Sequence, residues 1–182
     1  LDVVSTYAEM ALYFSSVAPL KELRNYIERI NLDSLIQDQK KPITWIVPVC
    51  YEAEFGLDSQ FVAQHNNLTV KQVIELHTSC AYRIYFTGFL PGFLYLGGLA
   101  KQICTPRKKT PRLKIPRGAV AIGGSQTGIY PTDSPGGWQI IGHTPIELFE
   151  PTRLRFEIAP ENKNNRILHL FLAQKVQIRL HC

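Results

Sequence analysis

The chain has 182 residues, 45% of them hydrophobic and 19% charged, which is the composition of a folded globular protein of one or two domains and excludes extensive disorder. Its apolar runs are too short to span a bilayer and no signal peptide is visible, so we expect a cytoplasmic protein without a membrane segment. The four cysteines lie far apart and without metal-ligand spacing, so we expect reduced thiols and no metal site.

The basic residues are concentrated in one part of the chain. The formal net charge is +5, and no acidic residue occurs between Glu75 and Asp133, where eight lysines and arginines lie. A segment of one sign attracts anions, although it is also typical of a solvated loop. No pattern of a known nucleic-acid-binding motif accompanies these charges, so we expect no nucleic-acid partner.

The first 80 residues predict alternating strands and helices. Period-two alternation over residues 4–14 indicates a half-buried strand, residues 19–30 place apolar side chains at helical spacing, and residues 43–49 resemble a second strand. Asp58 or Ser59 can begin a short helix and Thr69 can begin another. His65 and His77 have no metal-like neighbours in sequence, and we assign both to surface or packing roles.

Glycine is concentrated further along the chain. Eleven of the twelve glycines lie between Gly88 and Gly142, a shift that predicts a domain change near residues 42–51. The aromatic residues among these glycines suit either a pocket wall or a core. The run Gly123–Gly128 lacks the ending of a phosphate-binding Walker loop, and the segment has no nucleophile elbow and no carboxylate pair. These features predict a binding site rather than a complete catalytic site.

Six segments, taken together and in this order, resemble one family: the B subunit of 5-oxoprolinase, KipI and allophanate hydrolase subunit 1. The segments are Gly88–Phe93, Tyr95–Leu99, Thr105–Arg107, Ile115–Gly118, Gly124–Pro131 and Ser134–Trp138.

This resemblance implies an α+β fold, with a truncated ferredoxin-like N-terminal unit over residues 1–47. A cyclophilin-like β-barrel domain would follow over residues 48–182, with two short helices at its start. It also implies that the first strand and helix of the N-terminal domain are missing. Leu94 and His143 stand where the family often has Pro and Arg. The family's closing-strand motif is not recognisable after Pro151, which leaves the last strand of the barrel unassigned.

The resemblance further implies a non-autonomous component of a bacterial ATP-dependent 5-oxoprolinase, which converts 5-oxoproline to glutamate. Its partners would be a homologous cyclophilin-like protein, the C subunit, together with the ring-opening protein of the complex. ATP with Mg would act in the assembled complex, with no tightly bound cofactor. Two alternatives stay open because the motifs are shared: a KipI-like inhibitor of a sensor histidine kinase, and a carboxyltransferase-like subunit of urea or allophanate metabolism.

The positions that match the family motifs give the candidate site, in which no catalytic residue is assigned. The expected substrate-binding residues are Arg83, Phe89, Pro91, Gly92, Gln126, Thr127, Tyr130, Ser134 and Trp138. The cations available for an anion or phosphate are Arg107, Arg112 and Arg117.

Overall fold

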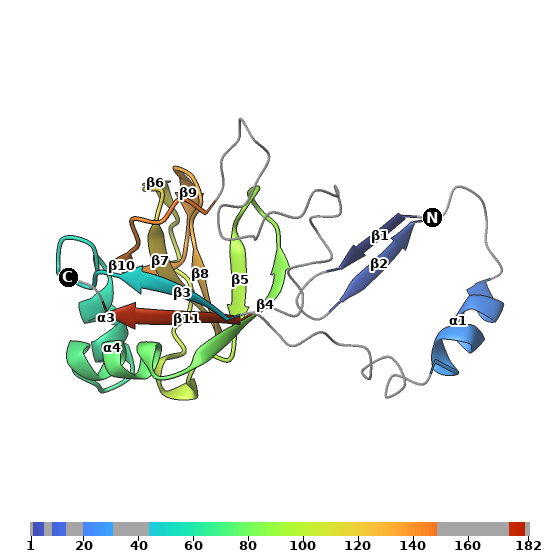
Figure 1. Cartoon of the computed structure of the whole chain (residues 1–182), viewed down its shortest axis with the longest axis horizontal. Helices are drawn as coiled ribbons and strands as arrows, with labels where there is room; N and C mark the ends of the chain where they lie inside the picture. The colour runs from blue at the N-terminus through green and yellow to red at the C-terminus, as the bar shows by residue number, and fades with distance from the viewer. Residues whose placement is uncertain (1, 6–8, 14–19, 31–43, 149–174, 181–182) are drawn as a thin grey trace. The chain divides into compact units, whose positions relative to one another are not determined.

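The computed structural model describes residues 2–5, 9–13, 20–30, 44–148 and 175–180, in two compact units, Leu1–Pro42 and Ile43–Cys182 (Figure 1). In the first unit, strands β1 (Asp2–Ser5) and β2 (Met10–Tyr13) pair antiparallel. Helix α1 (Leu20–Glu28) follows where the apolar spacing predicts a helix.

The prediction of a single strand over residues 4–14 is wrong. Val4 pairs with Ala11, so this stretch contains parts of two strands of a hairpin. Alternation of period two runs through both strands of a hairpin, and it does not by itself show where the chain turns back.

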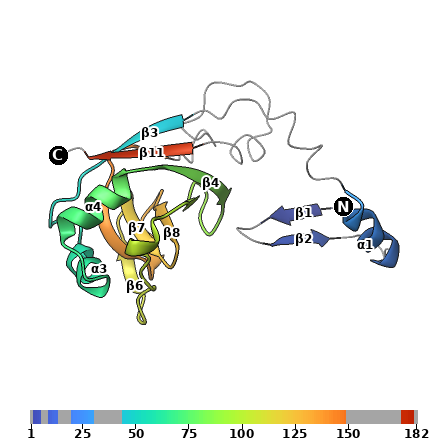
Figure 2. The same ribbon diagram turned by 90° about the horizontal axis from the view of Figure 1, so that it is seen from below.

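The second unit contains a seven-stranded mixed sheet in the order β10-β7-β8-β5-β4-β11-β3. Figure 2 shows β3 and β11 side by side in this sheet. All neighbours are antiparallel except β11 and β3, which are parallel. The strands are β3 (Thr44–Val49), β4 (Ala81–Thr87), β5 (Leu94–Gly97), β7 (Ala119–Gly123), β8 (Gln126–Ile129), β10 (Gln139–His143) and β11 (Lys175–Leu180). Strand β3, which the sequence groups with the N-terminal unit, belongs to this sheet, and the compact units divide at Pro42 rather than at residue 47.

The two edge strands of this sheet meet. Cys50, directly after β3, and His143, at the end of β10, exchange both backbone hydrogen bonds, at 2.8 and 2.9 Å. The sheet therefore curls into a barrel-like form. This confirms an α+β fold with a barrel-like sheet, whereas the ferredoxin-like character of the N-terminal unit stays a prediction.

Strand β11 is the barrel strand that the sequence leaves unassigned. It lies between β3 and β4, and its Val176 and Ile178 are fully buried. The segment alternates as a strand should, but without the family's closing motif its place in the sheet could not be predicted, because its pairing partners lie far away in sequence.

Two helices cover one end of the barrel, α3 (Ser59–His65) against β10 and α4 (Val70–Thr78) against β11. Both begin where the sequence predicts. Thr69 and Gln72 form a reciprocal capping box, with the Thr69 hydroxyl accepting from the Gln72 N–H and Gln72 Oε1 accepting from the Thr69 N–H. None of the described helices is long and apolar enough to cross a bilayer.

Apolar side chains pack on both faces of the sheet. The larger cluster fills the barrel and includes Val47, Tyr82, Leu96, Ile122 and Ile178. The smaller cluster lies on the outer face, where a two-stranded ribbon of β6 (Arg112–Ile115) and β9 (Ser134–Gly136) also contributes. A short 3-10 helix, η1 (Lys101–Ile103), follows β5.

Candidate functional site

The outer face of the sheet carries a continuous layer of aromatic rings, which we call the aromatic face: Phe86, Phe93, Tyr95, Tyr130 and Trp138. Phe93 is at its centre, with its ring centroid 4.7 Å from that of Tyr95, 5.0 Å from that of Tyr130 and 5.5 Å from that of Trp138. Phe86 stacks on Tyr95 at 4.1 Å. Phe93, Tyr130 and Trp138 are buried, so the open edge of the layer is formed by Phe86 and Tyr95.

Strand alternation and glycine spacing produce this layer. In β7, Val120 and Ile122 point into the barrel, which leaves Gly123 on the outer face. A Cβ at Gly123 would lie 2.5 Å from the Trp138 indole, and one at Gly128 would lie 3.0 Å from the Phe93 ring. The glycines of the motifs therefore let the rings lie directly on the backbone of the sheet.

The loop that joins β4 to β5 borders the aromatic face. Phe89 has a left-handed backbone, with φ of 66°, and its side chain is 61% exposed while its ring meets Phe93 edge-on at 5.8 Å. Left-handed backbone is uncommon for a residue with a bulky side chain and marks a position that the surrounding structure fixes. Pro91 is exposed beside it, and Gly92 is buried with φ of 86°.

Three other predicted site residues lie on or near the outer face. Arg83 is exposed on β4, with its guanidinium 5.7 Å from the centre of the Tyr85 ring. Gln126 pairs with Gly123, which lies beneath the Trp138 indole.

Ser134 is 7% exposed, and its hydroxyl has no hydrogen-bond partner among the described residues. In its strand, Ser134 shares a face with Gly136, where a Cβ would meet the Tyr130 hydroxyl.

Thr127 faces the opposite way. Its hydroxyl lies inside the barrel, donates to the Ala121 carbonyl at 3.0 Å and contacts His77 Nε2 at 2.8 Å. Tyr51 contacts the other ring nitrogen of His77 at 2.7 Å. Thr127 is thus part of a buried polar network in the core, and we do not keep it among the candidate ligand contacts.

The basic segment lies at the edge of the aromatic face and is fixed on both sides of Arg107. The Gln139 side chain donates to the Pro106 carbonyl at 2.9 Å, and the Lys108 N–H donates to the Gly137 carbonyl at 2.7 Å. The Arg107 guanidinium carbon lies 5.5 Å from the centre of the Trp138 ring, a cation–π contact.

A buried carboxylate, that of Asp58, binds two other cations of the basic segment, Lys108 and Arg112. Asp58, at the start of α3, accepts two hydrogen bonds of 2.8 Å from Arg112 and lies 3.4 Å from the Lys108 ammonium. Its second oxygen also accepts from the Ile140 N–H at 2.7 Å. Burial alone would raise the pKa of Asp58, but these hydrogen bonds and charges outweigh it and hold the pKa below its usual range.

Within the described part of the chain, four of the eight cations between Glu75 and Asp133 therefore pair with carboxylates from other segments. Lys114 pairs with Asp133 at 2.8 Å, and Arg117 pairs with Glu147 at 2.6 Å. Of the three arginines predicted to bind an anion, Arg112 and Arg117 already have carboxylate partners. Arg107 has none among the described residues, and it is the cation that borders the aromatic face.

The two tyrosine hydroxyls of the aromatic face stay protonated at neutral pH. Burial raises the pKa of Tyr130 to about 12. Burial also raises the pKa of Tyr95, an effect that the positive charge of Arg107 partly offsets. Both hydroxyls are within the electrostatic reach of Arg107, but Tyr130 is 1% exposed, so the half-buried Tyr95 is the one of the two that a ligand could reach.

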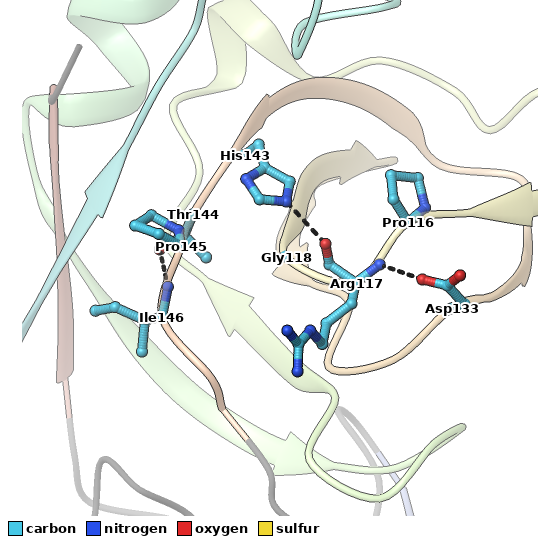
Figure 3. A pocket seen from close by; sticks show the side chains of 8 residues that line it. All are labelled: Pro116, Arg117, Gly118, Asp133, His143, Thr144, Pro145 and Ile146. Carbon is cyan, nitrogen blue, oxygen red and sulfur yellow. Dashed lines mark hydrogen bonds between the residues drawn. The ribbon is translucent and has the colours of Figure 1, made fainter.

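A separate pocket with a volume of about 340 Å³ lies at the end of β10 (Figure 3). Arg117 is the one predicted site residue that lines it, and its backbone N–H donates to Asp133 at 2.9 Å. His143 stands at a position where the family often has arginine. Its Nε2 contacts the Arg117 carbonyl at 2.8 Å. The charged side chains of this pocket, Arg117 and Asp133, are thus already paired with Glu147 and Lys114, and we take the aromatic face as the stronger candidate site.

Sequence reasoning missed three contributors to the site. Phe86 precedes the first family motif and carries only the signal of a strand. Tyr95 belongs to one of the family motifs but receives no role from it, although its alternation with Phe93 could have placed it on the same face. Asp58 carries only the signal of a helix cap, because nothing local in sequence connects it to Arg112.

The match to known families agrees with the motifs. The family model for the carboxyltransferase domain, subdomain C and D, matches residues 1–158. The chain belongs to this family. Within it, the chain is 49% identical over 151 residues to the 5-oxoprolinase B subunit of Haemophilus influenzae, which covers 82% of this chain and 70% of that protein. It is also 53% identical over 105 residues to the 5-oxoprolinase B subunit of Bacillus subtilis, covering 58% of this chain and 44% of that protein. These relatives confirm the resemblance to the group that contains the 5-oxoprolinase B subunits.

The matched region spans about half the length of the Bacillus subtilis relative. Among solved structures, the conserved uncharacterized protein PH0987 from Pyrococcus horikoshii is similar over 100% of this chain and 78% of its own, with 39% identity and a TM-score of 0.65. The urea carboxylase of Kluyveromyces lactis is similar over 90% of this chain and 16% of its own, with 21% identity and a TM-score of 0.66, which shows a shared fold alone.

Proposed function

We propose that this chain is one component of a bacterial ATP-dependent 5-oxoprolinase and has no turnover without its partners. The similarity to proteins named as B subunits of 5-oxoprolinase carries the proposal. The aromatic face supports it, because its residues supply rings, hydroxyls and a guanidinium but no carboxylate or histidine that could act as a general base. Such a surface can hold and orient a ligand while other subunits provide the reacting groups.

The proposal includes two partners in the cytoplasm, of which one is a homologous cyclophilin-like protein and the other opens the ring. The described residues contain no group of three or more His, Cys, Asp or Glu side chains that could hold a metal ion. The proposal also assigns Mg–ATP to the assembled complex rather than to this chain alone.

The test is reconstitution. The purified chain with ATP, Mg and 5-oxoproline should release no phosphate above background, and glutamate should form only when the two other subunits are added. Glutamate formation by this chain alone would contradict the proposal. Failure of the complete mixture, in an assay where a known 5-oxoprolinase is active, would also contradict it.

A KipI-like inhibitor remains the second candidate, since one exposed feature suits protein contact. Leu113 is 94% exposed in the basic ribbon, next to Lys114 and Arg112. Inhibition of a purified sensor histidine kinase by the natural chain, lost in Leu113→Ser, would favour this function. The carboxyltransferase alternative in urea metabolism has weaker support: 33% identity over 87 residues, 7% of that protein, to a protein named as a putative urea carboxylase from Emericella nidulans, and a distant fold similarity.

A further inference from the structure

A cation without a carboxylate partner among the described residues borders the aromatic face, whereas two nearby cations are engaged by one carboxylate. Lys108 and Arg112 share Asp58, whereas Arg107 contacts the Trp138 ring and has no ion-pair partner among the described residues. Asp58 thus engages Lys108 and Arg112 but does not reach Arg107, whose charge has no carboxylate beside it among the described residues.

The backbone that carries this exposed side chain is held before any ligand arrives. Hydrogen bonds on the Pro106 carbonyl and the Lys108 N–H hold the backbone on either side of Arg107, and the buried Trp138 indole lies under its guanidinium. A guanidinium that contacts a ring through its face keeps the N–H groups of its edge available. Ordering this side chain in advance lowers the entropic cost of binding.

The charge and its surroundings suit one class of ligand. A single planar guanidinium matches a carboxylate, with which it forms two parallel hydrogen bonds. The neutral hydroxyl of Tyr95 lies within its electrostatic reach, and the half-buried rings of Tyr95 and Phe86 offer a flat apolar surface beside it. A polyphosphate would need several free cations close together, and Lys108 and Arg112 are already bound to Asp58.

We propose that Arg107 binds the carboxylate of a small, flat, singly charged ligand at the open edge of the aromatic face. The inference rests on the proposed function to the extent that 5-oxoproline, a five-membered cyclic amide with one carboxylate, is such a ligand. Arg107 is then the residue that distinguishes this substrate class from the uncharged cyclic amide.

Trp138 provides a direct measurement, since the chain has two tryptophans and Trp45→Phe leaves Trp138 as the reporter. The full chain with this substitution is titrated with 5-oxoproline, with 2-pyrrolidone, which lacks the carboxylate, and with inorganic phosphate. Calorimetry on the natural chain measures the same three affinities independently of fluorescence.

We expect 5-oxoproline to bind at least about tenfold more tightly than 2-pyrrolidone, the lower end of what a charged hydrogen bond contributes. Arg107→Gln should remove this difference, and Arg107→Lys should restore only part of it. The matched control is Lys109→Gln, the exposed cation two residues away, which should change the affinity less than twofold. Unfolding temperatures of the variants check that each one folds.

Equal binding of 5-oxoproline and 2-pyrrolidone, or an affinity insensitive to Arg107→Gln, would overturn the inference. Phosphate binding that is tighter than 5-oxoproline binding and depends on Arg107 would overturn the carboxylate assignment, as would the absence of binding by all three compounds. The proposed function is judged separately by turnover of the complex: an active complex unaffected by Arg107→Gln refutes only the inference. An inactive complex with Arg107-dependent carboxylate binding refutes only the function.

Discussion

At the scale of single residues, burial determines how His77 behaves. Its ring lies in the barrel core between Tyr51 and Thr127, and burial lowers its pKa to about 3. Because the Thr127 hydroxyl donates its proton to the Ala121 carbonyl, Nε2 of His77 donates to Thr127 and Nδ1 accepts from Tyr51. The lone histidine that the sequence assigns to a surface or packing role is thus a neutral core residue with two partners.

This environment predicts a pH-dependent stability. Below pH 6.5 the unfolded chain protonates His77 while the folded chain does not, so the contribution is complete above pH 6.5 and is lost progressively towards pH 3. We expect the free energy of unfolding to fall by about 2 kcal/mol between pH 6.5 and pH 5 from this residue. Urea unfolding at a series of pH values measures it.

The slope of stability against pH, rather than its absolute value, separates His77 from other titrating groups. His77→Gln should flatten the slope between pH 6.5 and pH 5, even if it destabilises the protein. The exposed His65 is the control, and His65→Gln should leave the slope as it is. An unchanged slope in His77→Gln would contradict the burial argument.

At the scale of elements, the glycines of the motifs matter through the rings that lie on them. Gly123→Ala places a methyl group against the Trp138 indole and should destabilise the chain by about 1–3 kcal/mol, the usual cost of overpacking. The ring must shift, so the emission of Trp138 should change as well. Gly137 is the matched control, because the nearest atom to a Cβ there is 3.6 Å away. Gly137→Ala should leave both stability and emission nearly unchanged, and similar effects at the two positions would contradict this assignment.

The sequence predicts the elements whose signals are local. The Thr69 cap places the start of helix α4, and the glycine motifs indicate where the aromatic residues gather. The sequence does not predict that residues 4–14 form parts of two strands, nor that β11 completes the sheet, because strand pairing joins residues that lie far apart. The same limit applies to the site: the ion pair between Asp58 and Arg112 spans 54 positions, so the sequence does not show which cations of the basic segment are already paired.

At the scale of the whole molecule, the last strand determines whether the barrel is complete. Strand β11 pairs with β3 on one side and β4 on the other, and without it β3 would lose its sheet neighbour. Val176 pairs with Trp45, so the closing strand and a reporter tryptophan are adjacent.

Ile178→Ala should lower the free energy of unfolding by about 2–5 kcal/mol. Ile178 is fully buried, and its truncation leaves a cavity in the main core. Both tryptophans belong to the barrel unit, so unfolding in denaturant followed by tryptophan fluorescence reports on this unit. Arg179, the next residue, is exposed on the same strand, and Arg179→Ala should change the stability by no more than about 0.5 kcal/mol. If both variants unfold at the same denaturant concentration as the natural chain, β11 does not contribute to the core, and another segment must complete the barrel.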